Sequence, residues 1–395
     1  MLTDAEKKFG DLAATFYLCD MRYFISAGEA SGDLHASRLI ASQREKDPEA
    51  RFTFLGGDLM AAEAGHGPLL HFRDMAFMGF SEVIRNFGRI GRNLALARET
   101  LEKERPDALI VVDYPDFNLK LAATAKKLGI PVYYFIPPKV WAWKKWRIRS
   151  LRRLCRRLLC IFPFEVDFYK REGVDVDYVG NPSVEEIDSQ IAALPPAEDY
   201  RYQNDLTSRP LLLLVPGSRR GELRNNLPVM ASVARRRRDM QAVVAGAPGI
   251  EMEFYRSLTT LPVIYGETVG LMANARAALV TSGTATLECA LAGTPQVACY
   301  RANGSRLSYS IMRRLLNVDY VTLPNLIAGA PVVPEMLLHY CTPEAVGLRL
   351  AGIVDDGPER EKQLEGYAVI RRRLGEAGAA RRAADIIIND LRNHG

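Results

Sequence analysis

The feature that most constrains this chain is a repeated alternation of short apolar runs with helix-compatible segments. From Arg22 onward, each helical or loop segment is followed by one of the runs YFISA, RFTFLGG, ALIVVDY, PVYYFIP, LLCIFP and VDYVG. These runs are continuous and rich in β-branched and aromatic residues, as strands buried on both faces of a sheet are. Because helical segments separate them, the alternation predicts a parallel sheet covered by helices on both faces.

The alternation stops after Gly180 and then starts again. Residues 188–209 contain Pro195-Pro196, several charges and no long apolar run, so they are predicted to form a linker with a short helix. The runs LLLLVPGSR, QAVVAGA, LPVIYG, AALVTSG and PQVACYR follow. We therefore expect an α/β protein in which two doubly wound parallel-sheet domains face an interdomain cleft.

The predicted domain boundaries follow from this pattern. Residues 21–187 form the first domain, 188–209 the linker and 210–350 the second domain, and residues 351–395 form amphipathic helices that pack on the domains. The first twenty residues carry acids and only a short apolar patch, so they make a poor secretory signal. We treat residues 1–20 as an N-terminal extension that lies outside the fold.

Composition excludes several classes of protein. Of the 395 residues, 48% are hydrophobic and 25% are charged, which is enough for two packed cores. No apolar run approaches the roughly 20 residues that span a bilayer. The six cysteines are scattered without a CxxC pair, as in reduced cytosolic proteins, and the five histidines contain no HExxH pattern, so no zinc site is expected.

Polar motifs follow four of the apolar runs. They are GEASGD after YFISA, DYPDFN after ALIVV, PGSRRGE after LLLLV and SGTATLE after AALVT. Doubly wound sheets bind ligands in the crevice outside the carboxyl ends of their strands. The four motifs are therefore predicted to line the site, and GEASGD is predicted to bring polar groups and a helix start to it.

Two motifs of the second domain indicate a nucleotide diphosphate. In PGSRRGE, Ser218 supplies a hydroxyl and Arg219 a forked donor suited to phosphate, although a surface turn with two solvated arginines has the same pattern. In SGTATLE, small residues precede a helix start at Thr284, whose free backbone N–H groups favour an anion, and Glu288 can reach a ribose diol. An ordinary helix start with a glutamate near its first turn is the alternative.

Absent motifs narrow the chemistry. The chain lacks the GxGxxG fingerprint, the GxxxxGK[ST] loop and the GxSxG elbow, which disfavours a dinucleotide redox enzyme, an NTPase and an ordinary serine hydrolase. A nucleotide held without those loops between two α/β domains suits a nucleotide-sugar glycosyltransferase.

The DYPDFN motif supplies candidates for a general base. A carboxylate at Asp113 or Asp116 could take the proton of an acceptor hydroxyl, because burial or neighbouring carboxylates raise the basicity of aspartate. Ordinary turn chemistry is the alternative, since Asp before Pro is common in turns. Asn118 adds a neutral hydrogen-bonding partner.

Two basic segments raise the question of a charged surface. Eight Lys or Arg residues lie between Lys144 and Arg157, with three tryptophans around the start of this stretch. Nucleic-acid binding, attraction to anionic lipid headgroups and a solvated helix face remain open for it.

The segment from Ser81 has apolar residues at helical spacing among arginines, which fits core packing or a helix in the membrane interface. The residues predicted to face the membrane are Val83, Ile84, Phe87 and Ile90.

Together the motifs resemble one family. GEASGD, MAFMGFSEV, DYPDFN, VWAW, PGSR, SGTATLE and LPNLIAG occur in this order, and the set is similar to that of the lipid A disaccharide synthases, inverting glycosyltransferases of the GT-B class. The resemblance extends from about Met21 to the end of the sequence. It implies that UDP-2,3-diacylglucosamine is joined to 2,3-diacylglucosamine 1-phosphate (lipid X), giving a β-1,6-linked disaccharide and UDP.

The resemblance also implies a location and partners. Members of the family are cytoplasmic proteins of Gram-negative bacteria that lie on the surface of the inner membrane and need no metal or redox cofactor. We accordingly expect no cofactor and no nucleic-acid partner, and we leave open whether the chain forms a homo-oligomer.

Individual residues take their expected roles from the same resemblance. Asp113 matches the family's essential aspartate and is the candidate general base, and Arg219 matches the essential arginine that stabilises the UDP leaving group. The other donor-side positions are Ser218, Ser282, Gly283, Thr284, Glu288 and Asn325. The acceptor-side positions are Glu29, Ser31, Gly32, Asp33, Met78, Asp116 and Asn118.

The chain departs from the family pattern at three places, one of which is the unusual basic run Arg235–Arg238. Gly180-Asn181-Pro182 replaces the usual Gly-His-Pro, and Lys139 stands before VWAW, where a small or amide residue is common. Another UDP-sugar GT-B transferase or a UDP-sugar epimerase would share the donor site. A nucleic-acid-binding module would use the basic stretch and leave the nucleotide loops without a purpose.

Overall fold

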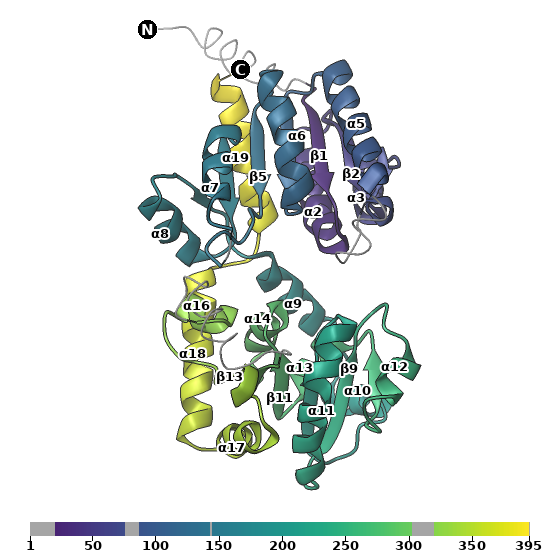
Figure 1. The fold of residues 1–395 in the computed structure, drawn as a ribbon, viewed down its shortest axis with the longest axis vertical. Coiled ribbons are helices and arrows are strands. Elements are labelled where there is room, and N and C mark those ends of the chain that lie inside the picture. Colours follow the sequence, from purple (N-terminus) through teal and green to yellow (C-terminus); the bar gives the residue numbers. More distant parts are fainter. Residues whose placement is uncertain (1–19, 76–86, 143, 302–319, 395) are drawn as a thin grey trace, which may run out of the picture. The chain divides into compact units, whose positions relative to one another are not determined.

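The computed structural model describes residues 20–75, 87–142, 144–301 and 320–394. The chain forms two compact units, each of which is described by itself. The first unit comprises Met1–Pro182 and Gly378–Gly395, and the second comprises Ser183–Ala377. Each unit is built on one sheet with helices around it (Figure 1).

A seven-stranded sheet in the order β3-β2-β1-β4-β5-β6-β7 forms the centre of the first unit, and every neighbouring pair is parallel. The strands are β1 (Arg22–Ala27), β2 (Arg51–Gly56), β3 (Leu70–His71), β4 (Ala108–Val112), β5 (Val132–Phe135), β6 (Arg157–Cys160) and β7 (Asp177–Tyr178). The helices are α2 (Ala30–Lys46), α3 (Asp58–Ala64), η1 (Phe72–Asp74), α5 (Phe87–Glu104), α6 (Pro115–Lys127), α7 (Arg147–Leu154), α8 (Pro163–Arg171) and α19 (Ala379–His394). Later strands add outward from β1 on one side and from β4 on the other, so the topological switch point lies between β1 and β4.

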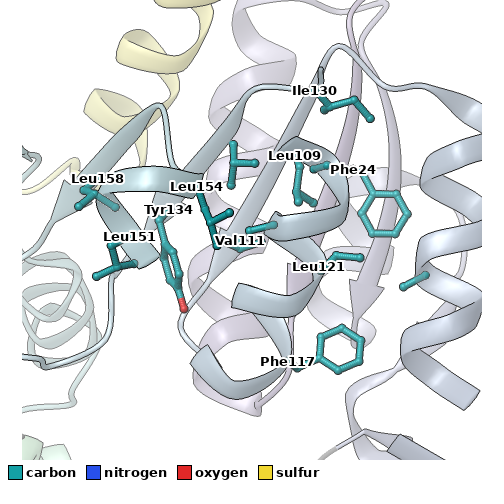
Figure 2. Packing of buried hydrophobic residues seen from close by; sticks show 14 of the residues in the cluster. Phe24, Leu109, Val111, Phe117, Leu121, Ile130, Tyr134, Leu151, Leu154 and Leu158 are labelled. Carbon is teal, nitrogen blue, oxygen red and sulfur yellow. The ribbon is translucent and has the colours of Figure 1, made fainter. Parts of the chain in front are cut away.

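Alternate residues of the central strands build separate cores on the two faces of this sheet. On one face Phe24, Leu109 and Val111 pack against α5, α6 and α7, and Figure 2 shows Phe117 and Leu121 of α6 beside them. On the other face the neighbouring strand residues pack against α2 and α19. Because both faces are buried, the strands are continuous apolar runs in the sequence instead of alternating ones.

The helix α19 belongs to the first unit although it follows the second unit in the sequence. Its Ala383 and Ile387 are fully buried against the sheet and α2. Asp390 accepts a hydrogen bond of 2.6 Å from the Tyr133 hydroxyl and forms an ion pair with Arg156. Figure 1 shows this yellow helix among the blue and purple elements of the first unit.

A six-stranded parallel sheet in the order β10-β9-β8-β11-β12-β13 forms the centre of the second unit. The strands are β8 (Leu211–Val215), β9 (Gln241–Gly246), β10 (Val263–Tyr265), β11 (Ala277–Thr281), β12 (Gln296–Tyr300) and β13 (Glu335–Leu337). The helices are α9 (Pro182–Ala192), α10 (Ala197–Gln203), α11 (Arg220–Arg236), α12 (Met252–Arg256), α13 (Thr268–Asn274), α14 (Thr284–Leu291), α16 (Leu323–Ala328), η2 (Leu338–Tyr340), α17 (Pro343–Val354) and α18 (Pro358–Leu374). Leu212 and Leu214 pack against α11 and α17, and Leu211 and Leu213 face the opposite core. The switch point of this sheet lies between β8 and β11.

The predicted α/β class with two doubly wound parallel sheets is confirmed. The predicted linker at 188–209 contains the end of α9 and the helix α10, and the two last helices divide between the units, α18 in the second and α19 in the first. Cys155, Cys160, Cys289, Cys299 and Cys341 are free thiols. Among the described helices, none has the length and apolar character needed to cross a bilayer.

Candidate active site

One candidate site, in the first unit, lies where β1 and β4 end. The two strands are paired in register, with Ala27 opposite Val112, so the turns that follow them leave the sheet side by side. The turn after β1 carries GEASGD, and the turn after β4 carries DYPDFN. Two motifs that are far apart in the sequence thus meet at the switch point, where doubly wound sheets bind ligands.

The turn after β1 packs closely against Tyr114. Gly28 is buried, and a Cβ atom at this position would lie 2.3 Å from the Tyr114 ring, so a larger residue does not fit. Glu29 is the half-buried N-cap residue of α2, Ser31 is exposed and Gly32 is buried. Burial raises the pKa of Tyr114, and the nearby Glu29 carboxylate raises it further. Glu29 and Ser31 are therefore the accessible polar members of GEASGD.

Asp33, the last residue of the same motif, is engaged inside the protein. It is 3% exposed, and its carboxylate accepts backbone hydrogen bonds from Gly57 (2.7 Å), Leu59 (3.2 Å) and Met60 (3.2 Å). These N–H groups lie at the start of α3, whose own N-cap residue is a glycine without a capping side chain. Asp33 therefore caps α3 from the neighbouring helix α2.

The turn after β4 holds two consecutive residues in the left-handed conformation. The φ angles are 46° at Asp113 and 48° at Tyr114, and this conformation costs roughly 1–2 kcal/mol per non-glycine residue. The Asp113 carbonyl accepts hydrogen bonds from Asn118 Nδ2 (2.7 Å) and from the Tyr134 hydroxyl (2.8 Å). Ser26 Oγ donates to Asn118 Oδ1 (2.7 Å) and so ties the turn to β1. Strain that several contacts maintain is typical of functional sites.

The Asp113 carboxyl is more basic than that of an ordinary aspartate. Burial raises its pKa, while the Lys139 ammonium and the backbone N–H of Tyr114 lower it by less. Asp116, by contrast, has an 80% exposed side chain that pairs with the guanidinium of the buried Arg147. The geometry therefore separates the two aspartates and favours Asp113 as the proton acceptor.

Two asparagines that were predicted to bind ligands are buried supports. Asn118 is fully buried, and its amide group holds the carbonyl of Asp113, as described above. Asn325 is 1% exposed; its Nδ2 donates to the Val333 carbonyl (2.9 Å) and to Glu335 Oε1 (2.9 Å), and its Oδ1 accepts from the Val333 N–H (2.7 Å). Both side chains are positioned to shape loops, and their polar atoms are occupied by protein groups.

The structure also contains a buried carboxylate that the sequence reasoning missed. Glu165 is 1% exposed and accepts hydrogen bonds from Trp141 Nε1 (3.0 Å) and the Phe162 N–H (3.1 Å). Burial raises the pKa of Glu165 to about 7, although these bonds and the Lys139 ammonium lower it. Asn181, which replaces the family's histidine, donates to a carbonyl of the same loop. The sequence signal that could have identified Glu165 is its place two residues after a proline, which is typical of a capping-box glutamate at the start of a helix.

A second candidate site, in the second unit, begins with the turn between β8 and α11. Glu222 Oε2 accepts a hydrogen bond from the Ser218 N–H (3.1 Å), and its Oε1 lies 3.7 Å from Arg219 Nη1. The Arg219 side chain is 73% exposed. Arg220 is less exposed, at 51%, and forms a closer ion pair with Glu251. Arg219 is thus the arginine of this motif that is better placed to meet an anion.

The turn between β11 and α14 lies at the neighbouring strand end. The Thr286 N–H (3.2 Å) and hydroxyl (2.7 Å) both donate to the Gly283 carbonyl and fix the first turn of α14. Ser282 is half-buried, and Gly283 and Thr284 are exposed. The Thr281 hydroxyl is buried and has no hydrogen-bond partner among the described residues. This helix start therefore offers several hydroxyl and amide groups to one ligand.

Glu288 lies one turn into α14 and has an unusual carboxyl group. Burial raises its pKa to about 7, the Glu186 carboxylate raises it as well, and the Thr284 hydroxyl lowers it. The two oxygens of this carboxyl group can accept hydrogen bonds from a pair of hydroxyls, such as those of a ribose diol.

The basic stretch forms α7, which has two different faces. Ile148, Leu151 and Leu154 are buried in the core of the first unit. The residues exposed on the other face are Arg149, Arg152 and Arg153, and Trp146 before the helix is 65% exposed. The helix therefore presents a cationic surface next to an exposed indole.

Some predicted site residues lie outside the described residues. They are Met78, Val83 and Ile84, and the side chain of Phe87 is likewise not described. Ile90 is half-buried on α5. In the described ranges, no three His, Cys, Asp or Glu side chains gather as a metal ion would require.

Solved structures with a similar fold include an epimerase and a glycotransferase. The UDP-GlcNAc 2-epimerase from Neisseria meningitidis bound to UDP-GlcNAc superposes with a TM-score of 0.66 at 13% identity, covering 95% of this chain and 100% of the epimerase. The glycotransferase of kitacinnamycin superposes with a TM-score of 0.58 at 16% identity, covering 94% of this chain and 99% of the glycotransferase. At such low identity these likenesses establish the GT-B fold alone.

Sequence comparison identifies the family. The model of the family LpxB, lipid-A-disaccharide synthetase, matches residues 23–386. The lipid-A-disaccharide synthase of Myxococcus xanthus is 41% identical over 379 residues, which cover 94% of this chain and 97% of the relative. The lipid-A-disaccharide synthase of Syntrophus aciditrophicus is 37% identical over 370 residues, covering 91% and 95%. Because the match includes both strand edges that carry the polar motifs, this chain belongs to the lipid-A-disaccharide synthetase family.

Proposed function

We propose that this chain is a glycosyltransferase that forms the lipid A disaccharide by joining UDP-2,3-diacylglucosamine to 2,3-diacylglucosamine 1-phosphate. One observation carries the proposal: the family match spans residues 23–386 and includes all four polar motifs. Such a reaction needs one site for a nucleotide sugar and one for an acceptor alcohol. The two polar strand edges, one in each unit, support this division.

The proposed reaction inverts the configuration of the donor sugar. The 6-hydroxyl of the acceptor attacks the anomeric carbon on the face opposite UDP, the bond to UDP breaks as the new bond forms, and the hydroxyl proton leaves. Asp113 takes this proton. Its raised pKa makes it a better base than an ordinary aspartate, and the bonds from Asn118 and Tyr134 to its carbonyl hold its backbone in place.

The second unit binds UDP and stabilises it as a leaving group. The exposed Arg219 guanidinium compensates the negative charge that grows on the diphosphate. The start of α14 adds the hydroxyl and amide groups of Ser282, Gly283 and Thr284, together with the positive end of the helix dipole. Glu288 hydrogen-bonds the ribose diol, and Ser218 adds a hydroxyl to the diphosphate side.

The remaining predicted residues divide into contacts and supports. Glu29 and Ser31 are accessible and bind hydroxyl groups of the acceptor sugar. The buried residues Asp33, Asn118 and Asn325 act through the loops that they hold. This division is consistent with the burial of each side chain and with the partners of its polar atoms.

The cationic face of α7 supports attachment to an anionic membrane surface, where both acyl-bearing substrates reside. Arg149, Arg152 and Arg153 attract phospholipid headgroups, and the exposed Trp146 suits the interface. Co-sedimentation with vesicles that contain anionic phospholipid tests this. Binding should fall when the three arginines are replaced by glutamine and when salt is raised; binding that resists both changes contradicts the assignment.

Incubation of the purified protein with both substrates tests the reaction. We expect UDP and a β-1,6-linked disaccharide in equal amounts, measured by mass spectrometry and by the anomeric coupling in NMR. Asp113→Asn should lower kcat by on the order of 10²–10⁴, whereas Asp167→Asn on the exposed surface of α8 should not. Formation of an epimer of the UDP sugar without any disaccharide would contradict the proposal and support an epimerase.

A further inference from the structure

The loop at residues 136–141 follows the carboxyl end of β5 and is rigidly packed. Ile136 has a positive φ of 60° and donates its N–H to the Leu159 carbonyl (3.1 Å). Two buried prolines follow. Val140 is 2% exposed and Trp141 is 7% exposed, and the indole of Trp141 is fixed by Glu165. Side chains on this loop therefore have little freedom to rearrange.

Lys139 is the exception, because it is exposed while the residues on both sides of it are buried. Its carbonyl accepts a hydrogen bond of 3.0 Å from the Ala142 N–H, so its backbone is held. The loop thus presents one ammonium group to solvent from a fixed position. An exposed lysine at this position costs little free energy of folding, but the packing of the turn does not depend on it.

Lys139 and Asp113 follow adjacent strands at the same edge of the sheet. The strands β4 and β5 are paired, with Val112 opposite Phe135, and the Asp113 N–H donates to the Phe135 carbonyl (3.3 Å). The turn that carries Asp113 and the loop that carries Lys139 therefore leave adjacent strands at the same edge. The ammonium is close enough to Asp113 and Glu165 to lower the pKa of both carboxyls.

We propose that Lys139 binds the phosphate of the acceptor while Asp113 receives the proton of the acceptor hydroxyl. This inference rests on the proposed function, in which hydroxyl and phosphate belong to the same sugar and must reach the site together. A phosphate dianion beside a carboxylate needs a compensating cation. Arg147 is already paired with Asp116, and lysine is a compact point charge that suits a terminal phosphate.

The test compares two acceptors, 2,3-diacylglucosamine with and without its 1-phosphate, in the presence of the same UDP sugar. Lys139→Gln should lower kcat/KM for the phosphorylated acceptor by roughly 10- to 100-fold, the effect of losing a charge-assisted hydrogen bond. The loss for the acceptor without phosphate should be several times smaller, so that the variant discriminates less between the two. Lys139→Arg keeps the charge and should restore much of the preference.

Lys127→Gln is the matched control. Lys127 is exposed at the far end of α6, near the amino edge of the same sheet, and its removal changes the net charge equally. An equal loss for both acceptors in Lys139→Gln overturns the inference, because it means that Lys139 acts only through Asp113 or the loop. If the wild-type protein forms disaccharide from neither acceptor, the proposed function fails and the inference fails with it.

Discussion

Asp33 offers a sharp test of the structure, because sequence reasoning and geometry lead to different expectations for Asp33→Ala. A residue that only binds the acceptor could be removed with a loss of turnover and an intact fold. In the structure, however, its carboxylate accepts three backbone hydrogen bonds from the start of α3. Two of these bonds are buried, those from Gly57 and Met60, and water cannot replace them in the variant.

The magnitude follows from these contacts. Each buried N–H that is left unpaired costs about 1–3 kcal/mol, so the middle of this range for the two buried groups means that Asp33→Ala should destabilise the first unit by about 3–5 kcal/mol. For a unit of this size, that corresponds to a fall in Tm of roughly 6–20 °C. Asp33→Asn should cost only about 1 kcal/mol, because its Oδ1 can still accept both buried bonds.

Tryptophan fluorescence during urea unfolding measures this effect selectively, because all three tryptophans lie in the first unit. Glu29→Ala is the matched control from the same motif, and it should alter acceptor kinetics with little change in the unfolding midpoint. The reasoning is refuted if Asp33→Ala leaves the midpoint unchanged, or if Asp33→Asn unfolds as readily as Asp33→Ala. Lost turnover with wild-type stability would instead indicate direct contact between Asp33 and the acceptor.

Three further predictions concern the chemistry. The acidic limb of the pH profile of kcat/KM should lie above the ordinary aspartate range, because the base must be ionised and burial raises the pKa of Asp113; a limb at or below pH 3.8 contradicts this. Arg219→Ala should lower kcat by on the order of 10²–10³-fold and barely change the free energy of unfolding, because the Arg219 side chain is 73% exposed. Arg220→Ala is the neighbouring control, and equal losses of kcat in both variants would contradict a special role for Arg219. Burial raises the pKa of Glu288 to about 7, so between pH 4.5 and about 7 its carboxyl stays protonated in the folded state but ionises in the unfolded state, and the stability of the second unit falls as the pH rises through this range. Glu288→Gln should therefore raise the free energy of unfolding at pH 8 by up to about 3 kcal/mol and have no such effect at pH 4. It should also raise KM for the UDP sugar. Urea unfolding measures the stability, and a gain that is independent of pH contradicts the assignment.

Local patterns were sufficient to predict the strands and the places where chemistry is found. The run ALIVV became β4 because a strand that is buried on both faces must be apolar throughout. The positions of residues such as Asp113 and Ser282 could then be predicted, because the carboxyl ends of parallel strands lie at one edge of the sheet. This reasoning needs only the order of elements along the chain.

Other features depend on contacts between distant segments, which local patterns do not encode. The acceptor of the α3 N–H groups is Asp33, more than twenty residues earlier, and only the packing of α2 beside α3 brings them together. The same holds for the buried Arg147 that pairs with Asp116. The left-handed turn at Asp113 is hidden for a different reason, because no glycine marks it and a hydrogen bond from Tyr134, on the next strand, helps to stabilise it. Burial of Glu165 likewise becomes apparent only when the sheet and its helices are assembled.

The return of α19 to the first unit has a consequence for biosynthesis. During translation the first 182 residues emerge before any of the second unit, yet one face of their sheet lacks the part of its cover that α19 supplies until Gly378 and the residues beyond it leave the ribosome. The nascent sheet must therefore expose apolar surface around Tyr133 for the time needed to make almost 200 more residues, from Ser183 to Ala377. The need of this protein for chaperones during synthesis should accordingly depend on the time that passes before α19 is made.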